Sequence, residues 1–222
     1  TRSSFAKIPP PRPPSFFCPW RPPAAVPRHS PGQNCGRRGI RELCVIKKAP
    51  ILRSALNPLG RGEKALGKTA YKLALGGCPL IKDDHSLFNQ SYAPFKDRVK
   101  ACVDSVNNAN AKTGGRSLYI ANCTADRMEF LERAMTAQEL GAGGIMAAPG
   151  LLGLSIIREL SSAPDFHLPI FLHPCFSGPL VLSADSGVSP FCCYGQFSRL
   201  AGADAAIFTS FSGRVSFTPE GC

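Results

Sequence analysis

The stretch Gly76-Gly77-Cys78-Pro79-Leu80-Ile81-Lys82-Asp83-Asp84-His85 decides the fold that the sequence predicts. Paired glycines are a common helix end, because glycine adopts the left-handed backbone conformation there without strain. The short apolar run that follows predicts a buried strand, and charged side chains come directly after it. We therefore expect a helix, a turn and a buried strand whose carboxyl end carries Lys82, Asp84 and His85.

Similar short apolar runs recur on both sides of this stretch. Their starts lie near Ile51, Pro79, Ser117, Gly144, Pro169 and Ala205. Spacings of 25 to 38 residues suit a strand followed by its return helix, so the pattern predicts a parallel α/β fold with about six strand-helix units. Helix ends are expected at Gly76-Gly77, Gly114-Gly115 and Gly141.

The segments between the apolar runs show helical periodicity. We expect helices at about 63–75, 95–109 and 125–140, each with one apolar face against the strands. The predicted core positions are Leu66, Ala70, Leu73 and Ala74 in the first helix, Val99, Cys102, Val103 and Val106 in the second, and Met128, Leu131 and Met135 in the third.

Residues 1–32 differ from the rest of the chain in composition. They hold ten of the 21 prolines and the single tryptophan, Trp20. Proline removes the backbone donor that helices and paired strands need, so we expect a disordered or polyproline-like tail followed by one domain at 33–222. Two interpretations of the tail stay open, an organellar transit segment and a mistranslated exon.

The net charge of +11 is concentrated near the amino terminus. Residues 1–41 hold eight of the 26 Lys and Arg residues and no Asp or Glu, which leaves 18 basic against 15 acidic residues, or +3, for the remainder. No DNA- or RNA-binding motif accompanies the basic residues, so we expect no nucleic-acid partner. Glycines and Pro149 interrupt the longest uncharged run, at 140–157, so we expect no membrane span.

Ten cysteines are present without any Cys-x-x-Cys pair, and most have apolar neighbours in the sequence. This arrangement is typical of reduced, buried thiols and not of a disulfide framework or a zinc site. The sequence therefore predicts a cytoplasmic or plastid or organellar stromal protein that is not secreted.

The segment from Gly76 to Gln90 resembles the activation-lysine segment of the RuBisCO large-subunit superfamily, particularly its RuBisCO-like (form IV), non-carboxylating branch. Four more segments resemble that family's first, third, fifth and sixth strands in the same order, at 54–60, 119–124, 170–174 and 207–217. The resemblance runs from about Gln33 to Cys222. It implies a TIM (β/α)8 barrel.

Six units do not close an eight-stranded barrel. The family's separate amino-terminal α+β domain and its last two strand-helix units have no counterpart in these 222 residues. We therefore expect a partial barrel, the fragment of a longer protein, whose first and sixth strands are unprotected edges.

The resemblance also implies a metal site. In the family, the lysine matching Lys82 reacts with CO₂ to form a carbamate, and this anion holds Mg²⁺ together with carboxylates at the positions of Asp84 and His85. Carbamate and carboxylate oxygens are the hard ligands that Mg²⁺ prefers. Because His85 replaces a glutamate and imidazole suits softer ions, another divalent metal is an alternative.

Further site residues follow from the same alignment of motifs. The catalytic positions are Lys82, His173, as a general base or substrate hydrogen-bonder, and Asn57, which replaces the family's first-strand lysine. The substrate-binding positions are Asn122, His173 and Arg214. For each of these there is a structural alternative: a packed histidine, a loop cap at Asn122, or a surface ion pair at Arg214.

The family resemblance leads to one main hypothesis and two alternatives. The main one is metal-dependent enolisation or isomerisation of a ketose phosphate, such as a methylthio-sugar phosphate of sulfur salvage, by an enzyme that is a homodimer when full length. Carboxylation of ribulose bisphosphate is an alternative that Asn57, Leu59 and His85 argue against. The second alternative is a non-catalytic, truncated remnant.

Overall fold

The computed structural model describes residues 34–182 and 187–209, so the tail expected at 1–32 lies outside the described residues. Within them the strands form one parallel sheet in the order β1-β2-β3-β4-β5-β6. The strands are β1 (Arg53–Leu56), β2 (Leu80–Asp83), β3 (Leu118–Asn122), β4 (Gly144–Ala147), β5 (Ile170–Leu172) and β6 (Ala205–Ala206). Each strand pairs with its successor along the chain, which confirms the partial barrel of six parallel strands.

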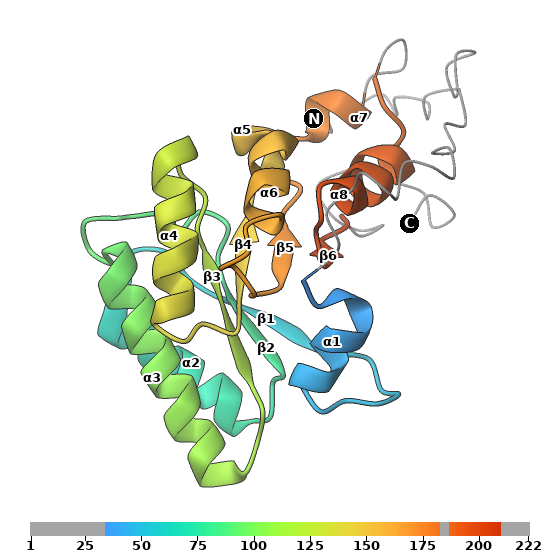
Figure 1. Ribbon diagram of the computed structural model, residues 1–222. Helices are drawn as coiled ribbons and strands as arrows, with labels where there is room; N and C mark the ends of the chain where they lie inside the picture. The colour runs from blue at the N-terminus through green and yellow to red at the C-terminus, as the bar shows by residue number, and fades with distance from the viewer. Residues whose placement is uncertain (1–33, 183–186, 210–222) are drawn as a thin grey trace, which may run out of the picture.

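Helices follow the strands on one side of this sheet. In Figure 1, α2, α3 and α4 lie together on one side of the strands, and α1 lies on the other side. The helices are α1 (Gly36–Leu43), α2 (Glu63–Leu75), α3 (Phe95–Thr113), α4 (Arg127–Glu139), α5 (Pro149–Leu152), α6 (Leu154–Ser161), α7 (Gly178–Val181) and α8 (Phe197–Leu200), with a π-helix, η2, at Phe191–Gln196. Positive φ angles at Gly77, Gly114 and Gly141 confirm the predicted helix ends.

The alternation of side chains along the strands produces two apolar cores. Leu56 and Ile81 belong to the larger core between the sheet and its outer helices. Leu80, Ile120 and Phe171 belong to a smaller core on the inner face of the curled sheet. Successive strand residues therefore point to opposite sides, as β-geometry requires.

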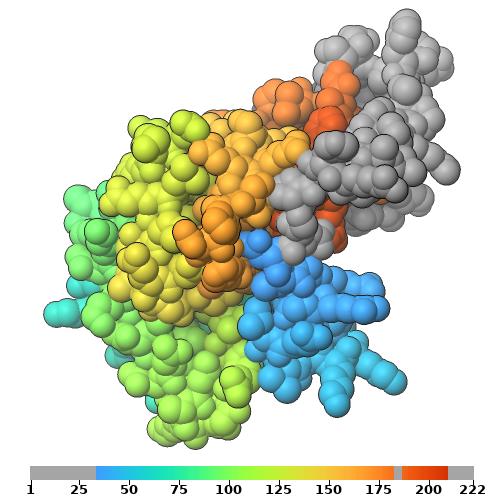
Figure 2. All heavy atoms as spheres, viewed as in Figure 1, coloured from blue at the N-terminus to red at the C-terminus, as the bar shows by residue number. Residues whose placement is uncertain are grey.

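Helix α1 covers part of the inner core and was not expected from the sequence. Ile40 is the one buried residue of this helix, and it packs with Cys44 against the inner core. A single buried position among glycines and arginines gives no apolar periodicity from which a helix could be predicted. Asp204 anchors the start of this helix, since its carboxylate accepts hydrogen bonds from the backbone N–H groups of Cys35 and Gly36. Figure 2 shows this first part of the described chain, in blue, against the orange segment before β5, where Asn34 Nδ2 donates to Leu168 O.

The predicted apolar faces of α2 and α3 are confirmed. Leu66, Ala70 and Ala74 are buried, and Leu73 packs against the same core. All four positions predicted in α3 are also buried, namely Val99, Cys102, Val103 and Val106. Gly67 allows α2 to approach α3 closely, because a Cβ atom added there would lie 3.0 Å from the backbone oxygen of Ala101.

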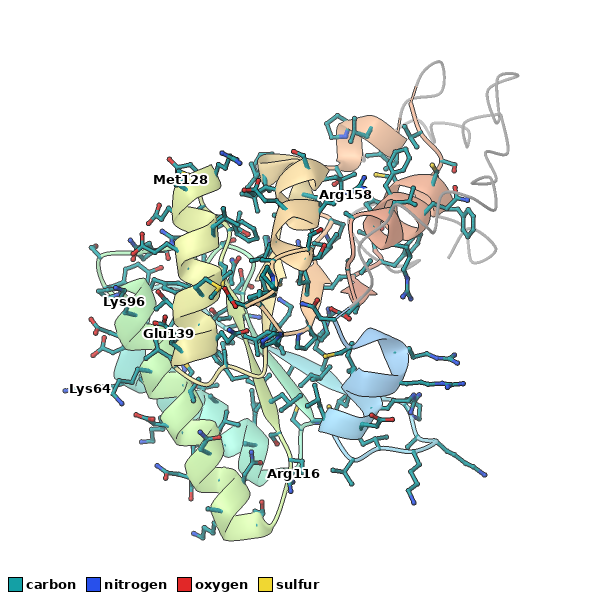
Figure 3. The ribbon with its side chains drawn as sticks, viewed as in Figure 1. Lys64, Lys96, Arg116, Met128, Glu139 and Arg158 are labelled. Carbon is teal, nitrogen blue, oxygen red and sulfur yellow. The ribbon has the colours of Figure 1, made fainter. Side chains whose placement is uncertain are left out.

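The predicted face of α4 was wrong at Met128. Its side chain is 72% exposed, at the end of α4 in Figure 3. Phe130, Ala134 and Ala137 form the buried face instead, at helical spacing. The other two predicted positions, Leu131 and Met135, are partly buried and pack against the same core, so the prediction is wrong at Met128 alone. Two of the fully buried residues are alanines, which carry a weaker apolar signal than methionine.

The described residues contain no helix with the length and hydropathy needed to cross a membrane. The eight described cysteines are all free thiols, at Cys35, Cys44, Cys78, Cys102, Cys123, Cys175, Cys192 and Cys193. Burial raises the pKa of Cys44 to about 11 and raises those of Cys102 and Cys123 further. These thiols are therefore poor nucleophiles, as expected of buried packing residues.

Candidate active site at the carboxyl ends of the strands

Lys82 lies on the inner face of β2, two residues beyond Leu80. Only 6% of the residue is exposed, and its Nζ donates a hydrogen bond of 2.8 Å to the backbone oxygen of Asp83. Burial, with a smaller contribution from the nearby positive charge of Arg53, lowers the pKa of Lys82 to about 8. More of this amine is therefore neutral, and nucleophilic, near neutral pH than in an exposed lysine.

Asp83 points the opposite way, into the core between the sheet and α3. Its carboxylate accepts hydrogen bonds from Arg98 Nε at 3.1 Å, Tyr119 Oη at 2.7 Å and the backbone N–H of Asn122 at 2.9 Å. Both members of the Asp83–Arg98 ion pair are fully buried. The first of the two aspartates is thus a structural anchor for β2, β3 and α3.

Asp84 and Asn122 shape the loop that follows β2. Asp84 Oδ1 accepts a hydrogen bond of 2.9 Å from the backbone N–H of Ser86, which fixes the carboxylate beside the strand end. Asn122 Nδ2 donates to the backbone oxygens of Asp84, at 3.3 Å, and His85, at 3.0 Å. Asn122 is fully buried, so the structure places this predicted substrate-binding residue beneath the loop, where it positions Asp84 and His85.

His85 and His173 meet across the inner side of the sheet. Their rings stack with centroids 4.5 Å apart and an angle of 12° between the planes. His85 follows β2 and His173 follows β5, and two strands separate β2 from β5 in the sheet. The sheet must therefore curl strongly, which brings together the site residues predicted from these distant segments.

The protonation state of His173 is set by its surroundings. Burial, followed by the neighbouring His85, Lys82 and Arg53, lowers its pKa to about 3. The backbone N–H of Cys175 donates to Nδ1 of His173 at 3.1 Å, so the ring proton of the neutral imidazole resides on Nε2. His173 therefore offers a hydrogen-bond donor at neutral pH.

A depressed histidine pKa makes the folded state sensitive to acid. As pH falls from 6.5 to 3, the unfolded chain binds a proton at this position that the folded chain does not, so stability falls over this window. His173→Asn keeps an acceptor for the backbone N–H of Cys175. We expect its melting temperature to fall less than that of the parent protein when the pH is lowered from 6.5 to 4. Calorimetric scans of both proteins across this range would measure the difference.

The exposed His167 supplies the control for this measurement, because its backbone N–H bonds Gln138 while its ring lies at the surface. His167→Asn is expected to follow the parent profile. Parallel acid profiles for the parent and His173→Asn would contradict the neutral state assigned to His173.

The structure does not place two of the predicted site residues beside Lys82, His85 and His173. Asn57 lies in the exposed loop after β1, and Arg214 lies outside the described residues. Conversely, Arg53 was missed: its charge lowers the pKa values of both Lys82 and His173. Ala55 pairs with Lys82, so it lies on the inner face of the sheet. Arg53 precedes Ala55 by two residues on the same strand and therefore lies on the same face, which strand alternation could have predicted.

The loops after β4 and β5 are in direct backbone contact. A Cβ atom added at Gly150 would lie 2.5 Å from the backbone oxygen of Cys175 and 2.9 Å from the carbonyl carbon of Phe176. Phe176 also has a φ of +61°, which is rare for an aromatic residue. Gly150 thus allows the segment that orients His173 to pack tightly.

The donor set at the end of β2 fits a divalent ion if Lys82 contributes as a carbamate. Within residues 34–182 and 187–209, no three His, Cys, Asp or Glu side chains lie where they could hold a metal ion. Asp84 Oδ1 and His85 Nδ1 are two possible metal ligands that lie 3.5 Å apart, beside Lys82, whose pKa is lowered. A carbamate on Lys82 would add the third, a hard oxygen.

The site region matches known proteins. Residues 40–214 match the model of the ribulose bisphosphate carboxylase large chain, catalytic domain. A 2,3-diketo-5-methylthiopentyl-1-phosphate enolase from Geobacillus thermodenitrificans is 37% identical over 194 residues, which cover 87% of this chain and 47% of that enzyme. A 5-methylthioribulose-1-phosphate isomerase from Rhodospirillum rubrum is 32% identical, over 86% of this chain and 50% of that enzyme.

The fold comparison agrees with the sequence comparison. A RuBisCO-like protein from Alicyclobacillus acidocaldarius superposes with a TM-score of 0.83 at 33% identity, over 91% of this chain and 51% of that one. This chain therefore spans about half the length of the relatives that it matches.

Proposed function

Because this chain belongs to the RuBisCO large-chain family, we propose that its site serves the enolisation or isomerisation of a ketose phosphate. The names of the matched relatives, an enolase and an isomerase acting on methylthio-sugar phosphates, support a substrate of that class. Half of each relative lies beyond the region matched here, so the activity proposed is that of a complete enzyme containing this half-barrel. We expect that enzyme to be a homodimer.

In this proposal Lys82, as a carbamate, Asp84 and His85 hold a divalent ion, with Mg²⁺ as the first candidate. When bound, such an ion would supply a Lewis acid that makes the carbon-bound proton next to the ketose carbonyl more acidic. Asn122 keeps the backbone of Asp84 and His85 in place through its two donated hydrogen bonds. Asp83 stays outside the metal site, because its carboxylate is committed to three donors on the helix side.

His173 follows β5 and stacks on His85, and in this proposal it binds the substrate and not the metal ion. Its Nε2–H is directed by the bond that Nδ1 accepts from Cys175, so it can donate a hydrogen bond to a substrate oxygen. With a pKa of about 3, the ring stays neutral throughout the physiological range. His173 therefore acts in this proposal as a hydrogen-bond donor that positions the substrate, in preference to the general base also considered from the sequence.

The observation that carries the proposal is the buried, partly neutral Lys82 beside Asp84 and the His85–His173 stack. The test is metal-dependent exchange of the carbon-bound proton next to the carbonyl of a methylthio-ketose phosphate, followed by NMR in deuterated water. We expect Lys82→Ala to abolish exchange, since the third metal ligand is lost. Lys64→Ala, an exposed position on α2, is the control and should exchange at the parental rate.

A metal-binding measurement tests the carbamate on Lys82 independently of the proposed reaction. Mn²⁺ binding followed by paramagnetic resonance should strengthen when bicarbonate is added to the parent protein, and should not do so for Lys82→Ala. A folded protein that binds Mn²⁺ without any response to bicarbonate would contradict the carbamate. Bicarbonate-dependent binding without proton exchange in a complete enzyme would contradict the reaction.

A further inference from the structure

Thr124 lies in the loop after β3, between the two loops that carry the site histidines. It follows Asn122, the last residue of β3, by two positions and is buried. In Figure 1, β3 and β4 lie between β2, which leads to His85, and β5, which leads to His173. A side chain at this place can contact both halves of the site.

Thr124 is connected to the metal side of the site through Asn122. The backbone N–H of Thr124 donates to Asn122 Oδ1 at 3.2 Å, which turns the amide nitrogen of Asn122 toward the loop after β2. That nitrogen donates to the backbone oxygens of Asp84 and His85. The amide can make all of these bonds in one orientation only, because its oxygen accepts and its nitrogen donates. Thr124 therefore supports the backbone of two proposed metal ligands.

Thr124 is connected to the substrate side through its hydroxyl group. Oγ1 accepts a hydrogen bond of 3.1 Å from the backbone N–H of Ala148, which is 2% exposed. The preceding residue, Ala147, accepts a hydrogen bond of 2.8 Å from the backbone N–H of His173. The hydroxyl group of Thr124 thus fixes the end of β4, against which the first residue after β5 is held.

Helix α4 holds Thr124 in place from behind. Arg133 is buried in this helix and donates from Nη1 to the backbone oxygen of Thr124 at 2.9 Å. The guanidinium of Arg133 also lies over the ring of Phe95, 5.3 Å from its centroid. The backbone N–H, the backbone oxygen and Oγ1 of Thr124 all have partners within the protein. A buried residue with these partners acts on the site through its neighbours.

We propose that Thr124 is a positioning residue for the His85–His173 stack, because it holds the loop after β2 through Asn122 and the end of β4 through its hydroxyl group. The two rings lie 4.5 Å apart and 12° from parallel, although two strands separate the strands that they follow. Such a stack requires the two backbones to be fixed relative to each other, and their hydrogen bonds meet at Thr124. A consequence for catalysis, which rests on the proposed function, is that His173 is held at a fixed distance from the metal ligand His85.

Thr124→Val is the variant that isolates the hydroxyl group, since valine keeps the shape and volume of the side chain. The backbone bonds with Asn122 and Arg133 remain, so the metal side should be preserved. The buried N–H of Ala148 loses its acceptor, so we expect the end of β4 to shift and His173 to shift with it. Thr124→Ser keeps the hydroxyl group and should behave as the parent protein does.

Nitrogen-15 NMR of the histidine rings, on the full chain at pH 7, measures this effect without metal or substrate. In the parent, His173 should be a single tautomer with its proton on Nε2, because Nδ1 accepts from Cys175. The stacked rings should also shift the ring protons of His85 and His173 upfield. In Thr124→Val we expect a mixture of tautomers at His173 and smaller upfield shifts. Thr124→Ser should give the parental signals.

Thr113→Val is the matched control, because Thr113 Oγ1 also accepts a backbone N–H, that of Gly115 at 3.1 Å, but at the exposed end of α3. Its histidine signals should equal those of the parent. Parental signals in a folded Thr124→Val, or equally changed signals in Thr124→Ser, would overturn the proposal. If Thr124→Val does not fold, Thr124→Ala takes its place, compared with Thr124→Ser, from which it differs by the hydroxyl group alone.

Proton exchange in a complete enzyme separates the role of Thr124 from the proposed reaction. There, Thr124→Val should exchange the substrate proton about ten- to a hundredfold more slowly at saturating substrate, because a small misplacement of a positioned group has a cost of this size. Its bicarbonate-dependent affinity for Mn²⁺ should stay parental. Equal exchange rates in Thr124→Val and the parent would overturn the catalytic consequence. Absence of exchange in the parent would reject the proposed function, and the NMR comparison would still decide the role of Thr124.

Discussion

Replacing Arg98 with methionine is expected to destabilise the described domain by about 3–5 kcal/mol, a large part of the stability of an ordinary domain. Methionine fills a similar volume but leaves the carboxylate of Asp83 buried without its cation. It also removes the donors that Arg98 offers to the backbone oxygens of Phe88 and Ala93. Urea unfolding followed by circular dichroism would measure the loss.

An exposed ion pair provides the comparison. Arg127 Nη2 lies 2.7 Å from Oε2 of Glu159, and the two side chains are 64% and 46% exposed. Arg127→Met should therefore cost less than about 1 kcal/mol. The double variant Arg98→Met/Asp83→Asn should be more stable than Arg98→Met alone, because it leaves no unpaired carboxylate at position 83. Equal losses for Arg98→Met and Arg127→Met would show that the buried pair contributes no more than a surface pair.

Replacing Lys82 with methionine should abolish bicarbonate-dependent metal binding and, at the same time, stabilise the fold at neutral pH. A shift in the pKa of Lys82 from 10.5 to about 8 corresponds to a cost of about 3 kcal/mol when both folded and unfolded chains are protonated. Methionine removes this cost and loses the hydrogen bond to the Asp83 oxygen, worth about 1 kcal/mol. The expected net gain at pH 7 is about 2 kcal/mol.

The pH dependence of this gain follows from the direction of the shift. Below pH 8 both states of the parent chain hold the proton, so the full cost applies. Between pH 8 and 10.5 the folded state has lost the proton that the unfolded state keeps, so the parent becomes more stable as pH rises. Urea unfolding of both proteins at pH 7 and 9.5 should show the gain shrinking. A constant difference would mean that Lys82 is not desolvated as described.

The strand order and the faces of α2 and α3 could be predicted from the sequence because their signals are local. Apolar runs at regular spacing mark the strands, and paired or single glycines mark the helix ends. The face of α4 could be predicted only in part. Leu131 and Met135 pack against the core as expected, but Ala134 and Ala137 are buried while Met128, the more apolar side chain, is exposed. The local pattern does not show which side chain at the edge of the face the tertiary packing leaves in solvent.

The site was predictable in part for a similar reason. Lys82, Asp84, His85 and His173 stand at strand ends, where a barrel gathers its functional side chains. That Asp83 belongs to the opposite face follows from strand alternation, but its partners Arg98 and Tyr119 lie on other elements and leave no local signal. Burial and the neighbouring Asp83 raise the pKa of Tyr119, which keeps it a donor in this network.

The absence of a side chain at Gly150 has a mechanical consequence for the mouth of the site. Since Gly150 lies against the backbone of Cys175 and Phe176 with no side chain between them, the start of α5 and the loop after β5 cannot move closer together. Any side chain at position 150 would have to push this loop away from α5. Because the same loop carries the backbone N–H that holds the ring of His173, such a change would also disturb the orientation of His173.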